Sequence, residues 1–162
     1  MAETIEKDLL YHAIRSLTTR ALLDRLSCDR EQLFQKMSSA DFMFMVVVVN
    51  HPGRMYINDL AQQMQLPIRK ISEMAQTLAA QDLIRWEFEG NGDQGTYVVP
   101  TKMGKKATQD QIDILEGYYT KVIQRYGKDR FKGLVKNLNE LESIMAKGIL
   151  ELEEEKSTIA IY

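Results

Sequence analysis

The order of local patterns between residues 54 and 101 constrains the fold more than any other feature of this sequence. A short apolar run at 55–57 reads as a strand, and apolar residues at helical spacing follow in 58–64 and 67–81. Pro67 suits the first position of the second helical segment, because the N–H that proline lacks has no partner there. The sequence therefore predicts a strand, a helix, a tight turn and a second helix.

Two further runs complete this segment. Residues 84–89 and 96–99 alternate as strands do, and the loop 90–95 between them is rich in Gly, Asn and Asp. This predicts a β-hairpin directly after the second helix. The full order is typical of a winged helix-turn-helix, which presents one helix and one hairpin to a DNA duplex. The predicted fold class is mainly α with a small β-hairpin wing.

The residues before this unit are predicted to be helical. Residues 4–26 form one amphipathic helix by their apolar spacing, and 27–37 suggest a loop with a short helical turn. Segment 39–50 is ambiguous, because its four valines favour a strand while its length and the Asn-His-Pro-Gly stop favour a buried helix. We predict a helix capped by Ser38 or Ser39, since a strand here would have no partner.

The residues after the unit predict two long helices. Thr101 can cap a helix over 102–126, Gly127 interrupts it, and 129–155 carries a broad apolar stripe. The terminal helices have more apolar surface than so small a middle could cover, which predicts a homodimer rather than a monomeric helical core. The predicted parts are an N-terminal dimerisation helix with linker, a DNA-binding lobe, and C-terminal dimerisation helices with an acidic tail, at residues 1–37, 38–101 and 102–162.

Charge gives a weak indication of the partner. The net charge of −2 argues against a bulk polyanion binder. Residues 54–106 contain seven Lys or Arg and six Asp or Glu, and are the only region on the positive side. This predicts modest non-specific affinity for DNA, because phosphate contacts supply most of that term.

Several classes of protein are not indicated by the sequence. No apolar run is long enough to span a bilayer, and the acidic N-terminus does not read as a signal peptide, so we expect a cytoplasmic protein. The single Cys28 excludes an internal disulfide, and acids that offset its neighbouring bases predict an unreactive thiol. His12 and His51 are too few for a typical metal site. No catalytic or cofactor motif is present, which predicts a non-enzyme without a cofactor.

The segment INDLAQQMQLPIRKISEMAQTLAAQDLIRW, followed by a wing and VVPTKMGKK, resembles the MarR family of bacterial transcription regulators. The shared plan runs over 57–106 and includes a Leu-Ala helix, a recognition helix, a wing and a Thr-x-x-Gly start to the next helix. The resemblance implies a homodimer held by the terminal helices, a recognition helix in the major groove and a wing at the minor groove. It also implies small-molecule control through a crevice between the DNA-binding lobe and the dimer helices.

Three positions depart from the family pattern. The wing has Asp93, Gln94 and Gly95 where the family usually has Asp-x-Arg, so it lacks the arginine that enters the minor groove. Asp82 replaces the glycine that ends the recognition helix, and Asp tolerates a left-handed conformation better than most residues. Glu73 stands where the family commonly has a basic residue. Its carboxylate repels phosphate, although it can accept a hydrogen bond from cytosine N4.

The predicted contacts with DNA come from the recognition helix, the wing and the start of the next helix. Arg69 and Lys70 are best placed to reach bases or phosphates, and Gln76 could read adenine. The alternative for these charges is a solvated helix face. The predicted DNA-binding set is Arg69, Lys70, Ser72, Glu73, Gln76, Thr77, Arg85, Asn91, Gln94, Lys102 and Lys105. The predicted ligand crevice is lined by Tyr11, Arg15, Phe42 and Met45.

The predicted function is a sequence-specific DNA-binding transcription regulator, a ligand-responsive repressor, that acts as a homodimer. Its predicted partners are double-stranded DNA, a second copy of the chain and a small-molecule effector, with no membrane. The alternative is a dimeric winged-helix scaffold or protein-interaction module with little DNA affinity. The near-neutral middle, Glu73 and the arginine-free wing favour this alternative.

Overall fold

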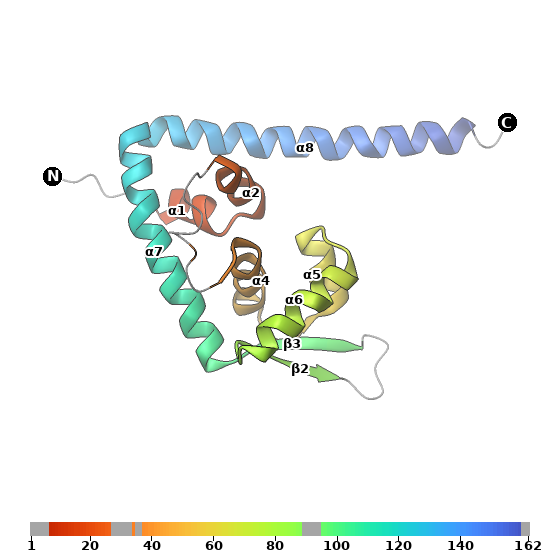
Figure 1. The fold of residues 1–162 in the computed structure, drawn as a ribbon. Helices are drawn as coiled ribbons and strands as arrows, with labels where there is room; N and C mark the ends of the chain where they lie inside the picture. The colour runs from red at the N-terminus through yellow and green to blue at the C-terminus, as the bar shows by residue number, and fades with distance from the viewer. Residues whose placement is uncertain (1–6, 27–33, 35–36, 89–94, 160–162) are drawn as a thin grey trace.

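The computed structural model describes residues 7–26, 34, 37–88 and 95–159 of the chain (Figure 1). Cys28 and the predicted wing contacts Asn91 and Gln94 lie outside the described residues. The helices are α1 (Lys7–Ile14), α2 (Leu17–Leu26), α4 (Ser39–Asn50), α5 (Ile57–Met64), α6 (Ile68–Ala80), α7 (Lys102–Tyr126) and α8 (Lys128–Ile159). The strands are β1 (Met55–Tyr56), β2 (Ile84–Phe88) and β3 (Thr96–Pro100). The mainly helical class with a small hairpin is confirmed.

The three strands form one antiparallel sheet in the order β1-β3-β2. Met55 of β1 and Trp86 of β2 both lie opposite Val98 of β3, which is fully buried. The predicted hairpin is therefore β2–β3, and the short strand before α5 completes the sheet by pairing with β3. This pairing places the start of α5 beside the wing.

The prediction of one helix over residues 4–26 is wrong, because the described part of this segment forms two helices. The main-chain N–H groups of Arg15 and Ser16 both donate to the carbonyl of Tyr11, which ends α1 in a turn. The Ser16 hydroxyl then accepts from the N–H of Thr19, at 3.5 Å, and α2 begins. A serine that bonds main-chain N–H groups competes with a continuous helix. The apolar spacing continues across the break, so it did not reveal the turn.

The ambiguous segment is the helix α4, as predicted. Ser38 caps it by accepting a hydrogen bond from the N–H of Asp41 at 3.0 Å. Phe42, Phe44 and Met45 are fully buried, and α4 contacts α5, α7 and β3. A helix that is apolar on every side belongs at the centre of a core, and this position overrides the strand propensity of its valines.

The two helices of the helix-turn-helix meet at a tight turn. Gln65 adopts a left-handed conformation, with φ of 53°, and the Leu66 N–H bonds the Ala61 carbonyl at 3.1 Å. Pro67 lies at the N-cap of α6, one residue before the predicted position. The apolar row of α6 faces the core: Ile71, Met74, Ala75 and Leu78 are buried.

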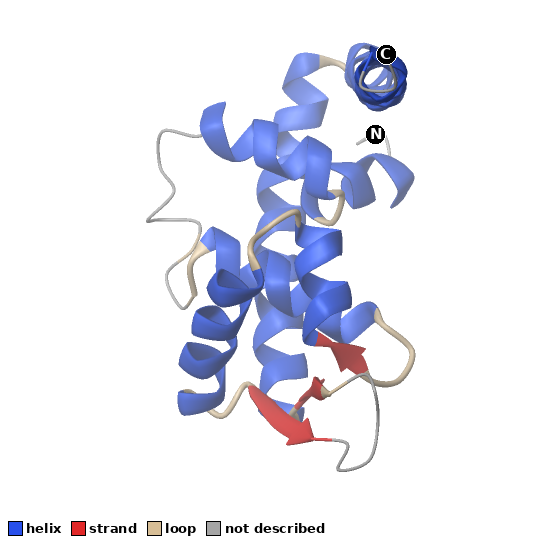
Figure 2. Cartoon of the chain, turned by 90° about the vertical axis from the view of Figure 1, so that its right-hand side faces the viewer, coloured by secondary structure: helices blue, strands red, loops and turns tan. Residues whose placement is uncertain are grey.

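The sheet and α8 lie at opposite ends of the molecule, and helix α7 runs from one to the other (Figures 1 and 2). Gly127, at φ 104°, turns the chain between α7 and α8. The first turns of α8 bury Phe131 and Val135 and contact α1, α2 and α7. The rest projects beyond the body as a straight rod (Figure 1). Among the described residues, no helix combines the length and hydropathy needed to cross a membrane.

Candidate nucleic-acid interface

Helix α6 has one buried face and one open face. Arg69, Glu73, Gln76 and Ala80 are exposed at spacings of four, three and four, and they lie directly opposite the buried row. Lys70, at the edge of this face, bonds no acid among the described residues. Ser72 is half-buried and faces sideways. The structure therefore leaves the predicted recognition face open to a partner.

The central pair on this face is an intrahelical ion pair. The Nε of Arg69 donates to Oε1 of Glu73 at 3.3 Å, with the side chains 92% and 53% exposed. The hydroxyl of Thr77 donates to the main-chain carbonyl of Glu73 at 3.1 Å. In water such an exposed pair contributes little to stability. In the structure the pair lays the guanidinium group of Arg69 along the helix surface.

The wing presents a mixed surface. Arg85 is exposed on β2, as predicted, while the Tyr97 hydroxyl donates to the Glu87 carboxylate at 2.6 Å. Two residues that the predicted contact set omits also stand here. The guanidinium of Arg54 lies 4.7 Å from the centre of the Tyr97 ring, and Phe88 is 70% exposed at the end of β2. In the sequence, Arg54 could have been found as a basic residue directly before the short strand that pairs with the wing.

A short junction connects the end of α6 with the start of α7. Asp82 takes the left-handed conformation expected from the sequence, with φ of 57°, and lets the chain turn into β2. The Thr101 hydroxyl donates to the Asp82 carbonyl at 2.6 Å and accepts from the Gly104 N–H at 2.9 Å. The Thr101 N–H donates to the Leu83 carbonyl at 3.1 Å. Thr101 thus caps α7 and also holds it against the end of α6.

The first turns of α7 bring lysines to the same end of the molecule as the wing. Lys102 and Lys105 are exposed, and neither bonds an acid among the described residues. Lys106 donates to Asp110 at 2.8 Å, and this hydrogen bond and the carboxylate charge raise the pKa of Lys106. Asp110 therefore holds Lys106 on the helix surface.

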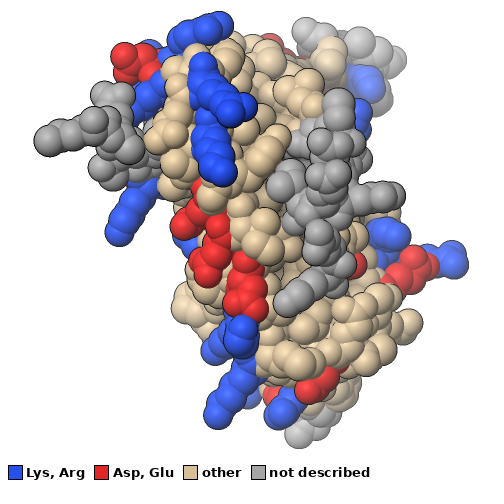
Figure 3. All heavy atoms as spheres, turned by 60° about the vertical axis from the view of Figure 1, so that its left-hand side comes forward, with Lys and Arg blue, Asp and Glu red and all other residues tan. Residues whose placement is uncertain are grey.

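Charges alternate in blocks farther along α7. Asp110, Asp113 and Glu116 follow the lysines, and Lys121 and Arg125 come after them. The corresponding face of the molecule shows a band of acidic side chains between two groups of basic ones (Figure 3). A polyanion on this side of the molecule would be repelled by the middle of α7 and attracted to the basic groups on either side of it.

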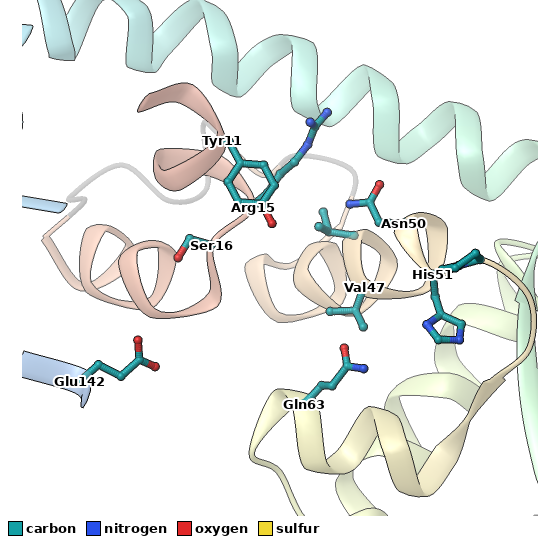
Figure 4. A pocket seen from close by; sticks show the side chains of 10 residues that line it. Tyr11, Arg15, Ser16, Val47, Asn50, His51, Gln63 and Glu142 are labelled. Carbon is teal, nitrogen blue, oxygen red and sulfur yellow. The ribbon is translucent and has the colours of Figure 1, made fainter. Parts of the chain in front are cut away.

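A cavity of about 470 Å³ opens between α1, the end of α4, α5 and α8 (Figure 4). Tyr11 and Arg15, two of the predicted ligand-binding residues, line it together with His51, Gln63 and Glu142. The other two, Phe42 and Met45, are fully buried in the core and do not line it, so the four do not form one site. The Nε atom of Arg15 is buried and has no hydrogen-bond partner among the described residues.

The described residues hold no group of three His, Cys, Asp or Glu side chains that could bind a metal ion. His12 instead makes an edge-to-face contact with the ring of Tyr11, with 5.8 Å between the ring centres.

Solved structures share this arrangement. The S. aureus MepR–DNA complex has a TM-score of 0.65 at 14% identity, over 78% of this chain and 94% of that chain. NMB1585, a MarR family regulator from Neisseria meningitidis, has a TM-score of 0.58 at 23% identity, over 83% of this chain and 94% of that chain. The transcriptional regulator PA4135 has a TM-score of 0.63 at 21% identity, over 77% of this chain and 92% of that chain.

No protein-family model and no curated protein matches the sequence itself. The similarity is therefore one of structure, at identities of 14% to 23%. The similarity is not confined to the helix-turn-helix and wing, because it covers 77% to 83% of this chain and more than nine-tenths of each solved chain. This chain has the winged-helix fold of the MarR family of transcription regulators.

Proposed function

We propose that this protein is a sequence-specific DNA-binding transcription regulator that acts as a homodimer and represses until an effector binds. The observation that carries the proposal is the open face of α6. Its exposed row includes Arg69 and Gln76, whose side chains can bond base edges, with Glu73 between them, while the opposite row holds the helix to the core. The MepR–DNA complex, which has the same fold, supports this use of the fold.

The surroundings of α6 supply the phosphate contacts in this proposal. Lys70 flanks the open face, Lys102 and Lys105 begin α7, and Arg85 stands on the wing. Lysine and arginine side chains that contact phosphates position a protein on the duplex without reading its sequence. Because they are few, the affinity for non-specific DNA is modest and falls quickly with salt.

The second copy in this proposal packs on α8. Leu138, Leu141, Met145, Ile149 and Leu152 recur at spacings of three and four along α8. From Leu141 onward the apolar side chains of this row are each more than half exposed, and no described element covers them. A continuous apolar stripe of this length is unfavourable in water, and a second α8 with its neighbouring helices would bury it.

The effector in this proposal occupies the cavity beside α4. That cavity touches α5 of the helix-turn-helix through Gln63 and α8 through Glu142, so a ligand there contacts both parts of the molecule. A ligand that binds better to one spacing of the two recognition helices shifts the dimer toward that spacing. The Nε of Arg15, which bonds no acceptor in the described part of the chain, favours a ligand with an acceptor group.

Selection of randomised duplex DNA by the purified full-length protein tests the proposal. We expect enrichment of a two-fold symmetric site with half-sites about one helical turn apart. Affinity for the selected site, measured by mobility shift, should fall steeply with salt and change when phenolic or fatty-acid ligands are added. No enrichment and no shift at low salt would contradict DNA binding and favour the dimeric scaffold instead.

A further inference from the structure

The ion pair on the open face of α6 has an uneven geometry that bears on base recognition. Glu73 accepts from the Nε atom of Arg69, and no bond joins it to the two terminal nitrogens. A guanidinium group carries five N–H donors, one on Nε and four on the terminal nitrogens. The contact with Glu73 therefore uses the N–H of Nε and leaves the N–H groups of the two terminal nitrogens free of Glu73.

The N–H groups of these terminal nitrogens match one base in particular. Two parallel N–H groups of an arginine fit the O6 and N7 acceptors of guanine in the major groove, and this is the commonest specific contact of its kind. Arg69 lies in the first turn of α6, and the N-terminal residues of a recognition helix are those that reach base edges. Arg69 is thus placed for guanine and not only for phosphate.

We propose that Arg69 reads a guanine in each half-site, and that Glu73 is a positioning residue that holds the guanidinium group in its reading orientation. This inference rests on the proposed DNA-binding function and names the base that the first turn of α6 recognises. Glu73 itself bonds no base in this arrangement. A G·C pair therefore stands opposite the start of α6.

The same pairing accounts for an acid at the centre of a DNA-facing surface. A lone carboxylate there would repel the phosphates, whereas one bonded to Arg69 is partly neutralised. In the free protein the pair is exposed and weak. When α6 enters the major groove and water is excluded, the effective dielectric constant falls and the attraction between Arg69 and Glu73 strengthens. The guanidinium group of Arg69 is then held in its orientation toward the base.

The test compares variants on the site that the full-length wild-type protein selects from randomised DNA. At the most enriched guanine, replacement by 7-deazaguanine removes the N7 acceptor and leaves base pairing intact. We expect this replacement to weaken wild-type binding by about tenfold, which is typical when a bidentate base contact is removed. R69K, which keeps the charge and removes the fork, should bind both sites with nearly equal affinity.

Two substitutions at Glu73 separate positioning from simple charge. Both E73A and E73Q remove a negative charge, so both should raise affinity for unrelated DNA. Only E73Q keeps an oxygen that can accept from Nε of Arg69, so it should retain most of the guanine discrimination, while E73A should lose it. Asp59, an exposed acid in α5, supplies the charge control, because D59A should raise affinity and leave discrimination unchanged.

The outcomes distinguish this inference from the function it rests on. A wild-type protein that selects no DNA overturns both. If the protein selects DNA and E73A discriminates guanine as wild type does, only the role of Glu73 is overturned. If 7-deazaguanine at every enriched position leaves wild-type affinity unchanged, or if R69K discriminates guanine from 7-deazaguanine as wild type does, the assignment of Arg69 is overturned while the DNA-binding function stands.

Discussion

The hydroxyl of Thr101 donates a hydrogen bond to the main-chain carbonyl of Asp82, 19 residues earlier, with 2.6 Å between the oxygen atoms. The same hydroxyl accepts from the Gly104 N–H and so caps α7. One side chain therefore joins the end of the recognition helix α6 to the helix that leads to α8. A shift of α7 must move this junction or break it.

Thr101→Val should lower the free energy of unfolding by about 1–3 kcal/mol, because it removes the cap of α7 and leaves a carbonyl without its donor. Valine keeps the shape of threonine, so the effect comes mainly from the hydroxyl. Urea denaturation followed by circular dichroism, at a fixed protein concentration, measures the change. Thr96→Val, in β3 of the wing, removes a hydroxyl outside the junction and should change stability by less than about 0.5 kcal/mol. Equal effects of the two substitutions would contradict the role of Thr101.

Gly104→Ala should destabilise the protein because α7 lies against the main chain of Leu83. An added Cβ would overlap the Leu83 carbonyl oxygen and would lie 2.9 Å from Cε of Met45. The obstacle is main chain, so α7 must move, at a cost of about 1–3 kcal/mol. Gly117→Ala in the same helix meets nothing within 4 Å and should instead stabilise by up to about 1 kcal/mol. Thermal unfolding measures both changes, and a G104A variant as stable as wild type would contradict the role of this close approach.

Asp82→Gly should raise the free energy of unfolding by about 0.5–1 kcal/mol. Asp82 holds φ at 57°, where a side chain costs about 1 kcal/mol that glycine avoids. Gln81→Gly is the matched control, because Gln81 has φ of −92° and gains nothing from glycine. A stability lower than wild type in D82G would show that the Asp82 side chain has a role beyond the turn.

The salt dependence of DNA binding should identify which lysines meet phosphate. Lys105→Ala should weaken binding to all sequences and reduce the slope of log affinity against log salt by roughly 0.9 for each phosphate that Lys105 neutralises. Asp110→Asn should strengthen binding and increase the slope. In the wild-type protein the Lys106 ammonium bonds the Asp110 carboxylate, and the substitution releases it. Fluorescence anisotropy titrations at several salt concentrations provide both slopes. An unchanged slope in K105A would place the DNA elsewhere.

Dimerisation should depend on the exposed stripe of α8. Met145→Glu and Ile149→Glu each place a charge in that stripe, and the pair together should convert the dimer to a monomer at micromolar concentration. Lys147→Glu changes a charge between them on the opposite side of the helix and should leave the dimer intact. Sedimentation equilibrium measures the masses. A wild-type protein that sediments as a monomer would rule out the homodimer.

Local chemistry in the sequence was sufficient for most of the elements. Ser38 and Thr101 as caps, Asp82 as a left-handed residue and Gly127 as the break between long helices are short-range features, and the structure has all four. The single helix predicted over residues 4–26 was wrong because its apolar period continues through Ser16, while one hydroxyl bond decides where α2 begins. Periodicity reports which residues are buried and does not detect such a local competition.

Capping, turn preference and amphipathic spacing act within a few residues, so they are enough to predict most of the helices and strands and the polar composition of the recognition face. What those polar residues can contact depends on tertiary packing. It left the face of α6 that carries Arg69 and Glu73 open, brought Arg54 to the wing through β1–β3 pairing, and placed Tyr11 and Arg15 in a cavity while Phe42 and Met45 went into the core. These relations depend on how distant segments pack together.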